Sequence, residues 1–243
     1  MNSKHALITG GGSGIGLACA KRLEADGHQI TIAGRNEAQL KAAGYNYVVM
    51  DVTNEESVDN AFSSIKPVDI LISNAGAAQT APLLKTPLSM WTAMLDVNLT
   101  GAFLCAKAGI PNMVDQGWGR FIVIASTSAL KGYAYTGAYT ASKHGAMGMV
   151  KTLAIELARS GVTANAICPG FTETDLLSRS IENIVKTTKM NEDEALKALL
   201  KDNPMGRAIQ PDEVAASVSW LCSSDADSTN GQPIVIDGGE LAS

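Results

Sequence analysis

Short runs of aliphatic and β-branched residues alternate along the chain with longer stretches in which apolar residues recur every three or four positions. The runs predict strands over 5–9, 29–33, 46–50, 68–73, 119–125, 162–167 and 232–236. The longer stretches predict helices over 15–26, 54–64, 88–115, 137–159 and 211–222, with a weaker one at 36–43. Near-continuous Val, Ile and Leu are typical of strands in a parallel sheet that is covered on both faces. We therefore predict a single doubly wound α/β domain over residues 1–243, with about seven parallel strands and helices on both faces.

One segment, residues 171–203, interrupts this alternation. It contains no strand pattern and predicts two helices, 175–188 and 192–202. Asn191 is a suitable N-cap for the second helix, and the three acidic residues that follow it complement the helix dipole. Because the segment follows the C-terminal end of a predicted strand, where open α/β sheets bind ligands, we predict a helical lid over the substrate.

Composition and charge exclude several classes of protein. The net charge of −5 argues against a nucleic-acid partner, since such proteins carry excess Lys and Arg. No run approaches the ~18 apolar residues of a membrane span, and the N-terminus shows no export signal. The four cysteines lie far apart and predict neither disulfides nor a metal site: Cys19, Cys105, Cys168 and Cys222. Scattered thiols favour a cytoplasmic protein.

A glycine-rich loop follows the first predicted strand and opens the first helix: Thr9-Gly10-Gly11-Gly12-Ser13-Gly14-Ile15-Gly16. Glycines let the backbone approach a pyrophosphate, whose charge is favoured at a helix N-terminus. The spacing is Thr-Gly-x-x-x-Gly-x-Gly rather than the usual Gly-x-Gly-x-x-Gly. A flexible strand–helix connection would show the same glycines, but the position favours dinucleotide binding.

Tyr139 and Lys143 lie four residues apart on a predicted helix and therefore share one face. That face continues through apolar residues and points toward the sheet, where a lysine is unusual unless it is paired or functional. A snorkelling lysine on an amphipathic helix is the alternative. Ser126 lies thirteen residues before Tyr139, directly after the strand predicted at 119–125. This spacing favours a catalytic group over the alternative.

In their joint order and spacing, these motifs resemble the classical short-chain dehydrogenase/reductase family over essentially the whole chain. The residues that carry the resemblance are Thr9-Gly10, Gly14, Gly16, Asp51-Val52, Asn74-Ala75-Gly76, Asn98, Ser126, Tyr139, Lys143, Pro169-Gly170 and Asp237-Gly238-Gly239. Three further stretches look like the polyketide-type ketoreductases and hydroxyacyl-thioester dehydrogenases of that family: 124–127, 141–145 and 168–174. The resemblance implies a Rossmann fold.

The resemblance also implies a role for each catalytic residue. Tyr139 would be general acid in ketone reduction and general base in alcohol oxidation. Lys143 would lower the pKa of that phenol with its charge and hold the nicotinamide ribose. Ser126 would orient the substrate oxygen, and Asn98 would anchor a water of the proton relay. A local bond from Asn98 to the backbone of its own helix is the alternative.

Residues after the second strand indicate the cofactor. Gly34 stands where an acidic residue would bind the ribose 2′-hydroxyl, and Arg35 can fork onto a 2′-phosphate. This favours NADP(H); NAD(H) remains the alternative, since Ser13 stands where many NADP-preferring relatives carry a basic residue. By resemblance, the further cofactor contacts are Gly10, Ser13, Gly14, Ile15, Gly16, Asp51, Val52, Asn74, Gly76, Tyr139, Lys143, Pro169, Gly170, Thr172 and Thr174.

We therefore expect an NAD(P)H-dependent oxidoreductase that interconverts a ketone and a secondary alcohol, either a 3-oxoacyl or 3-hydroxyacyl thioester or a cyclic ketone. A catalytically silent dinucleotide-binding scaffold is the alternative, but it would need no proton relay. A nucleotide-sugar epimerase would need a larger C-terminal domain. The expected partners are a small-molecule substrate and three further copies of the chain, since classical relatives commonly form homotetramers through helices matching 88–115 and 137–159. No nucleic acid or membrane partner is expected.

Overall fold

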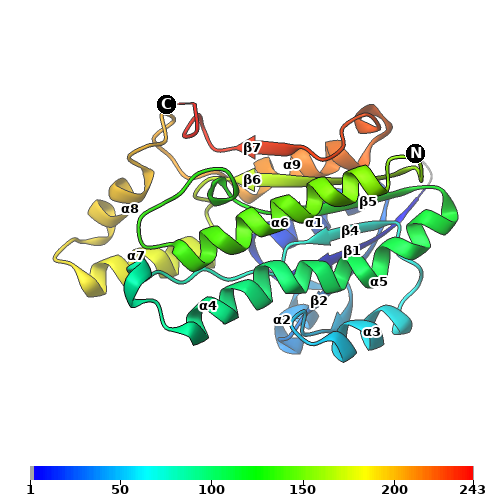
Figure 1. Cartoon of the computed structure of the whole chain (residues 1–243), viewed down its shortest axis with the longest axis horizontal. Coiled ribbons are helices and arrows are strands. Elements are labelled where there is room, and N and C mark those ends of the chain that lie inside the picture. Colours follow the sequence, from blue (N-terminus) through cyan, green and yellow to red (C-terminus); the bar gives the residue numbers. More distant parts are fainter. Residues whose placement is uncertain (1–2, 243) are drawn as a thin grey trace.

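Seven parallel strands form one sheet at the centre of the protein, a computed structural model of which describes residues 3–242 (Figure 1). Their order, β3-β2-β1-β4-β5-β6-β7, is that of a doubly wound α/β fold. The strands are β1 (His5–Thr9), β2 (Gln29–Gly34), β3 (Asn46–Val49), β4 (Ile70–Ser73), β5 (Gly119–Ile124), β6 (Val162–Pro169) and β7 (Pro233–Ile236). The predicted fold class is confirmed by this parallel order, and the inner strands β1, β4, β5 and β6 are buried along their whole length, as a sheet covered on both faces requires.

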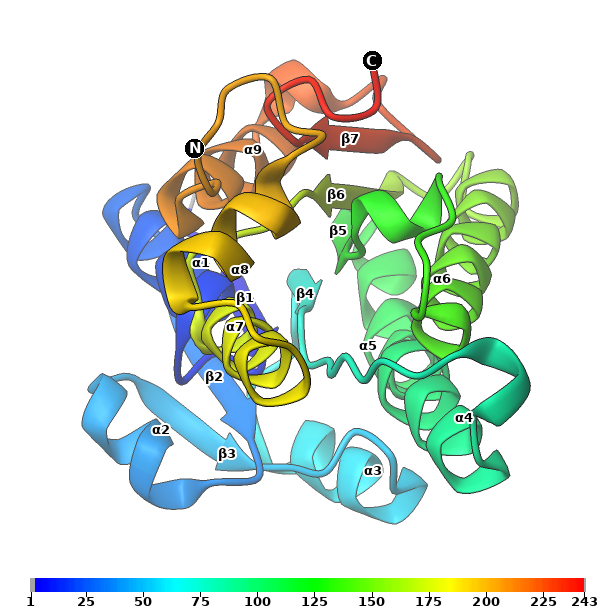
Figure 2. The ribbon, with the colours of Figure 1, turned by 90° about the vertical axis from the view of Figure 1, so that its left-hand side faces the viewer.

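Helices cover both faces of the sheet and enclose two apolar cores (Figure 2). One face carries α1 (Gly14–Ala25), α2 (Glu37–Ala43) and α9 (Pro211–Cys222). The other carries α3 (Glu55–Ser64), α5 (Gly101–Gln116) and α6 (Gly137–Glu156). Three short 3₁₀ helices lie in the connections: η1 (Leu83–Lys85), η3 (Thr127–Ala129) and η4 (Ser224–Ala226).

The helix predicted over 88–115 is interrupted by a π turn. It consists of α4 (Leu88–Leu95), the π turn η2 (Asp96–Thr100) and α5, which follow one another without a break. By length and composition alone, Leu88–Gln116 is apolar enough to cross a membrane, but half of its most apolar window is buried inside the protein. Packing of α5 against β4 and β5 therefore explains its apolar sequence. π turns are frequent at functional sites, and this one contains Asn98.

The two helices predicted within residues 171–203 are α7 (Asp175–Thr187) and α8 (Glu192–Leu200). Asn191 caps α8 as predicted: its Oδ1 accepts a hydrogen bond from the Glu194 N–H at 3.0 Å, and the Glu194 carboxylate accepts one from the Asn191 N–H at 2.9 Å. Figure 2 shows α7 and α8 in front of the carboxyl ends of the strands. The lid segment thus lies at the edge of the sheet where its sequence position places it.

Candidate active site

The order of the strands reverses between β1 and β4, and the loops that follow these two strands are bonded to each other. The Thr9 hydroxyl oxygen accepts hydrogen bonds from the backbone N–H of Asn74 (3.0 Å) and of Ala75 (2.9 Å). The Asn74 side-chain amide donates to the carbonyls of Thr9 (2.9 Å) and Gly10 (3.2 Å). Asn74 therefore holds the glycine loop at the switch point of the sheet, where α/β proteins bind nucleotides.

The glycine loop is a cradle that β-carbons would fill. Gly10 and Gly14 have φ of 64° and 51°, in the left-handed region that favours glycine. A β-carbon on Gly16 would lie 2.6 Å from the Asn74 amide nitrogen and closer still to the Gly10 carbonyl oxygen. Within the described residues, the N-cap Ser13 makes no side-chain bond to the first turn of α1. The loop and the first N–H groups of α1 therefore suit a pyrophosphate.

Beside this loop lies a cleft of about 640 Å³. Of the predicted cofactor contacts, Gly10, Ser13, Arg35, Asp51, Val52 and Gly76 line it. The sequence prediction missed further lining residues, although they lie at or within a few residues of predicted strand ends or in the helices predicted at 36–43 and 88–115. They are Gly12, Ala33, Asn36, Glu37, Gln39, Leu40, Met50, Ala75 and Val97. The cleft extends from the glycine loop along the ends of β2 and β3, the path an adenosine would take.

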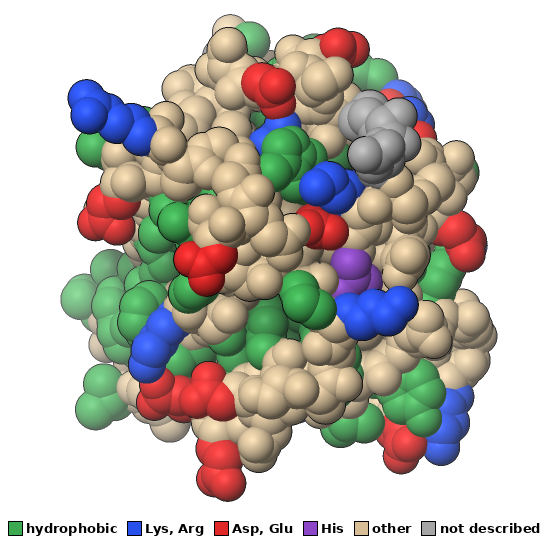
Figure 3. All heavy atoms as spheres, turned by 90° about the vertical axis from the view of Figure 1, so that its right-hand side faces the viewer, with side chains coloured by type: hydrophobic (Ala, Val, Ile, Leu, Met, Phe, Trp, Pro, Cys, Tyr) green, Lys and Arg blue, Asp and Glu red, His purple; other side chains and the backbone are tan. Residues whose placement is uncertain are grey.

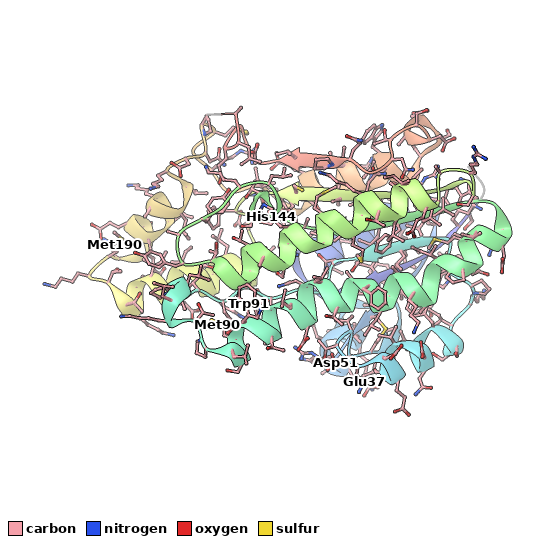
Figure 4. The ribbon with its side chains drawn as sticks, in the orientation of Figure 1. Glu37, Asp51, Met90, Trp91, His144 and Met190 are labelled. Carbon is pink, nitrogen blue, oxygen red and sulfur yellow. The ribbon has the colours of Figure 1, made fainter. Side chains whose placement is uncertain are left out.

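Three charged residues line the cleft away from the glycine loop: Arg35, Glu37 and Asp51. Partial burial opposes ionisation of Asp51, but two hydrogen bonds from Thr53 and the charge of Arg35 keep its pKa below the usual value. Glu37, which Figure 4 labels together with Asp51, also lines the cleft, but its carboxylate is bonded to residues other than Arg35. Its carboxylate pairs with Lys41 at 3.0 Å and accepts a hydrogen bond from the Tyr47 phenol at 3.0 Å. Arg35 itself is exposed, so an anionic ligand can reach it.

Three of the predicted catalytic residues converge next to the cleft. Ser126 lies just after β5 and is the N-cap of η3. Its Oγ accepts a hydrogen bond from the Ser128 N–H at 3.1 Å. Tyr139 lies in the first turn of α6, and its phenol hydrogen-bonds the Ser126 side chain. Lys143, one turn further, donates from Nζ to the Ile124 carbonyl at 2.9 Å and lies 5.7 Å from the centre of the Tyr139 ring.

Burial dominates the acid–base properties of this group. It raises the pKa of Tyr139, against the opposing hydrogen bond from Ser126. It lowers the pKa of Lys143 to about 8, with Cys168 acting in the other direction. The expectation that Lys143 lowers the phenol pKa is therefore not met, because desolvation outweighs any such effect and Nζ is held on Ile124. At neutral pH Tyr139 is a protonated phenol, the form that donates to a ketone.

Asn98 joins the same site through the π turn. Its side chain is buried, its Oδ1 accepts from the Ala77 N–H at 3.1 Å, and its Nδ2 donates to the Ala77 carbonyl at 2.9 Å. The alternative of a bond to its own helix is therefore wrong. A β-carbon on Gly76 would lie 2.8 Å from Asn98 Oδ1 and 3.7 Å from Lys143 Nζ. Gly76 thus lets the loop after β4 pass between the two side chains.

The turn after β6 brings further predicted residues to the site. The Thr174 methyl group would lie 3.1 Å from a β-carbon on Gly14, so this residue covers the glycine loop. The Thr172 hydroxyl instead donates to the Gly170 carbonyl at 3.0 Å and is buried. Pro169 ends β6, and the Gly170 N–H donates to the Ile236 carbonyl at 3.0 Å.

Cys168 is a buried residue of the site whose place the sequence prediction missed. Burial raises the pKa of its thiol to about 11, against a hydrogen bond from the Ser126 backbone and the charge of Lys143. It therefore remains a neutral thiol beside the lysine. Residues 3–242 contain no group of three or more His, Cys, Asp or Glu side chains arranged to hold a metal ion.

Comparison with known proteins places the chain in a family. A family model described as enoyl-(acyl carrier protein) reductase matches residues 10–240. The chain is 36% identical to a D-beta-hydroxybutyrate dehydrogenase of Cupriavidus necator, covering all of this chain and 99% of that relative. It is 37% identical to the 3-oxoacyl-[acyl-carrier-protein] reductase MabA of Mycobacterium tuberculosis, with 98% and 92% covered.

Solved structures agree with these relatives. A variant of actinorhodin polyketide ketoreductase solved with NADPH superposes with a TM-score of 0.93 at 33% identity, with 98% of this chain and 97% of that chain covered. The relatives reduce ketones or oxidise the corresponding alcohols. The sequence-based assignment is confirmed: the chain belongs to the short-chain dehydrogenase/reductase family, which binds a nicotinamide dinucleotide and includes these ketone and alcohol oxidoreductases.

Proposed function

We propose that the protein interconverts a ketone and a secondary alcohol with Tyr139 as the proton-transferring group. The observation that carries the proposal is the convergence of Ser126, Tyr139 and Lys143 beside the glycine loop. A catalytically silent scaffold would need the loop but not these three side chains. The cradle at Gly16 and the cleft beside it fit a dinucleotide, which supplies or accepts a hydride when it is bound.

Each side chain has a separate task in this proposal. The Ser126 hydroxyl donates to the substrate carbonyl oxygen and orients it toward the Tyr139 phenol. In reduction the phenol gives its proton to that oxygen as negative charge develops there. Lys143, held on Ile124, offers its remaining N–H groups to the ribose hydroxyls. Asn98, whose amide is bonded at both ends to Ala77, would anchor a water that returns the proton.

Replacing the phenol tests the assignment. Tyr139→Phe should lower turnover by at least about 100-fold, as loss of general acid–base catalysis does. Cofactor binding should remain, because the glycine loop is untouched. Tyr45→Phe removes a phenol that bonds Glu24 on the surface and is the matched control. A Tyr139→Phe enzyme that kept most of its activity would refute the role, and a parent inactive on every ketone would favour the silent scaffold.

For the cofactor, we propose a preference for NADP(H) over NAD(H). The support is Arg35 at the open end of the cleft, with Gly34 adding no carboxylate and Glu37 paired to Lys41 and Tyr47. A charge-assisted guanidinium–phosphate contact is worth about 1.5–3 kcal/mol, or roughly 10- to 100-fold. Turnover with each cofactor at limiting concentration tests this, and Gly34→Asp with Arg35→Ile should reverse it. Equal efficiency with both cofactors would refute the preference and leave the oxidoreductase assignment standing.

The substrate we propose is a 3-oxoacyl or 3-hydroxyacyl thioester, with a cyclic ketone as the alternative. Apolar side chains of the lid support both substrates. Leu176 on α7 is 39% exposed, and Met190, labelled in Figure 4 between α7 and α8, is 41% exposed. The names of the acyl-carrier-protein and polyketide reductases among the relatives favour the thioester. A panel comparing a 3-oxoacyl thioester with cyclic and aryl ketones would distinguish the two.

We further propose that the protein is a single-domain cytoplasmic homotetramer that acts on a small molecule and binds neither nucleic acid nor membrane. Exposed apolar residues on the outer sides of α5 and α6 support association: Phe103, Val114 and Ile155. Figure 3 shows hydrophobic side chains gathered along one side of the molecule. All four cysteines are free and buried, which suits a reducing compartment. Light scattering at micromolar concentration tests the assembly; a monomer would refute it.

A further inference from the structure

A buried carboxylate lies near the active site and takes no part in the proposed chemistry. Glu240 follows β7 and is 3% exposed. Removing a carboxylate from water is strongly unfavourable unless hydrogen bonds replace its hydration, so such a residue has a specific partner. The Tyr133 phenol donates a hydrogen bond to Glu240 Oε1. Burial and this carboxylate raise the pKa of Tyr133, which keeps the phenol protonated and able to donate.

Tyr133 connects Glu240 to the residue that would bind the substrate oxygen. It lies on the connection between β5 and α6, with Ser126 before it and Tyr139 after it. The Thr127 side chain, which is buried, also hydrogen-bonds the Tyr133 phenol. Thr127 is the next residue after Ser126, so a network of hydrogen bonds runs from the buried Glu240 through the half-buried Tyr133 to the backbone that carries the Ser126 hydroxyl.

The other carboxylate oxygen of Glu240 faces the turn after β6. A β-carbon on Gly170 would lie 3.3 Å from Glu240 Oε2. The segment around Glu240 is itself held, because Asp237 accepts hydrogen bonds from the N–H groups of Gly239 and Leu241, each at 2.8 Å. Glu240 is therefore held between the turn at Gly170, which is predicted to contact the cofactor, and the loop that carries Ser126.

We infer that Glu240 is a positioning residue, which through Tyr133 and Thr127 fixes the Ser126 hydroxyl relative to the turn at Gly170. The inference rests on the proposed function, which gives Ser126 its role, and on Gly170 as one of the predicted cofactor contacts. A reaction between bound groups depends on their relative position to within a fraction of an ångström, and a loose contact costs rate rather than affinity. Loss of the network should therefore lower kcat more than it changes the Kd of the cofactor.

The test compares Glu240→Leu, Glu240→Gln and Tyr133→Phe on a ketone that the parent reduces with NADPH. Leucine removes the acceptor, and kcat should fall about tenfold, as for loss of a buried hydrogen bond to a charged group. Glutamine keeps an acceptor oxygen and should restore most of the rate. Tyr133→Phe should reproduce the loss, and Tyr133→Phe with Glu240→Leu should be no slower than either single variant. The Kd of NADPH, measured by its fluorescence, should change less than about threefold.

Glu24→Leu and Tyr45→Phe are matched controls, because they break a phenol–carboxylate bond of 3.1 Å on the exposed surface. They should leave kcat unchanged. The inference is overturned if Glu240→Leu and Tyr133→Phe lower the melting temperature but retain the parent kcat. Should Glu240→Leu fail to fold, Tyr133→Phe decides the question, because it also removes the hydrogen bond to Glu240. Retained activity in Tyr139→Phe would instead refute the proposed function, independently of these variants.

Discussion

Burial of Lys143 in the site should lower the free energy of unfolding of the protein, and a variant without its charge should measure by how much. Lys143 is 5% exposed, and burial lowers its pKa from 10.5 to about 8. The folded protein therefore disfavours the charged form that the unfolded chain carries at neutral pH. We predict that Lys143→Met, which keeps the length of the stem and removes the charge, makes the protein more stable while abolishing turnover.

The size of the effect follows from two opposing terms. The lowered pKa of Lys143 corresponds to about 3 kcal/mol of unfavourable free energy below pH 8, since each pKa unit is worth about 1.4 kcal/mol. The hydrogen bond of 2.9 Å to the Ile124 carbonyl is lost in the variant, which costs about 1 kcal/mol. A net gain of about 2 kcal/mol should remain, equivalent to a rise of about 4–8 °C in Tm for a chain of this length.

The pH dependence of the stability difference between the parent and Lys143→Met distinguishes removal of the buried charge from better packing of the methionine. Between about pH 8 and 10.5 the unfolded parent binds a proton that the folded parent has lost, so parent stability rises with pH in this window. The advantage of Lys143→Met should be complete below pH 8 and should disappear as pH approaches 10.5. Urea unfolding at pH 7 and at pH 10 measures it, with the exposed Lys151→Met on the same helix as control. A variant less stable than the parent at pH 7, or a gain independent of pH, would refute the reasoning.

Three further predictions follow from the packing of the site and of the two apolar cores. Gly16→Ala should abolish dinucleotide binding, measured by fluorescence titration, because the added carbon collides with the Gly10 carbonyl and the Asn74 amide. Asn98→Ala should lower both kcat and stability, the latter by about 1–3 kcal/mol in urea unfolding, since the N–H and carbonyl of Ala77 lose their partners. The four buried thiols should resist a thiol reagent at pH 8 in the folded protein and all react once it is unfolded; rapid labelling of the native protein would contradict their burial.

Local pattern determined much of this fold. The period of the apolar residues located every strand and, apart from the division of 88–115 into α4 and α5, every α-helix to within a few residues, because strands and amphipathic helices have different periodicities. The spacing of Tyr139 and Lys143 placed both on one helix face, and the glycine loop predicted a site for a pyrophosphate, because each motif lies within one or two turns of chain. Asn191 likewise capped its helix as predicted, since a capping box involves only four consecutive residues.

Tertiary structure alone decided what depends on contacts between distant segments. The direction of the Tyr139 and Lys143 pKa shifts follows from burial by several elements together, which a spacing of four residues does not contain. The π turn that places the Asn98 side chain next to Ala77 could not be predicted, because the apolar pattern of 88–115 is that of one continuous helix. The Tyr133–Glu240 bond joins residues 107 positions apart. Such pairs form only when the sheet has brought its carboxyl ends together, so three-dimensional packing, and not local pattern, determines the electrostatics and the positioning of this site.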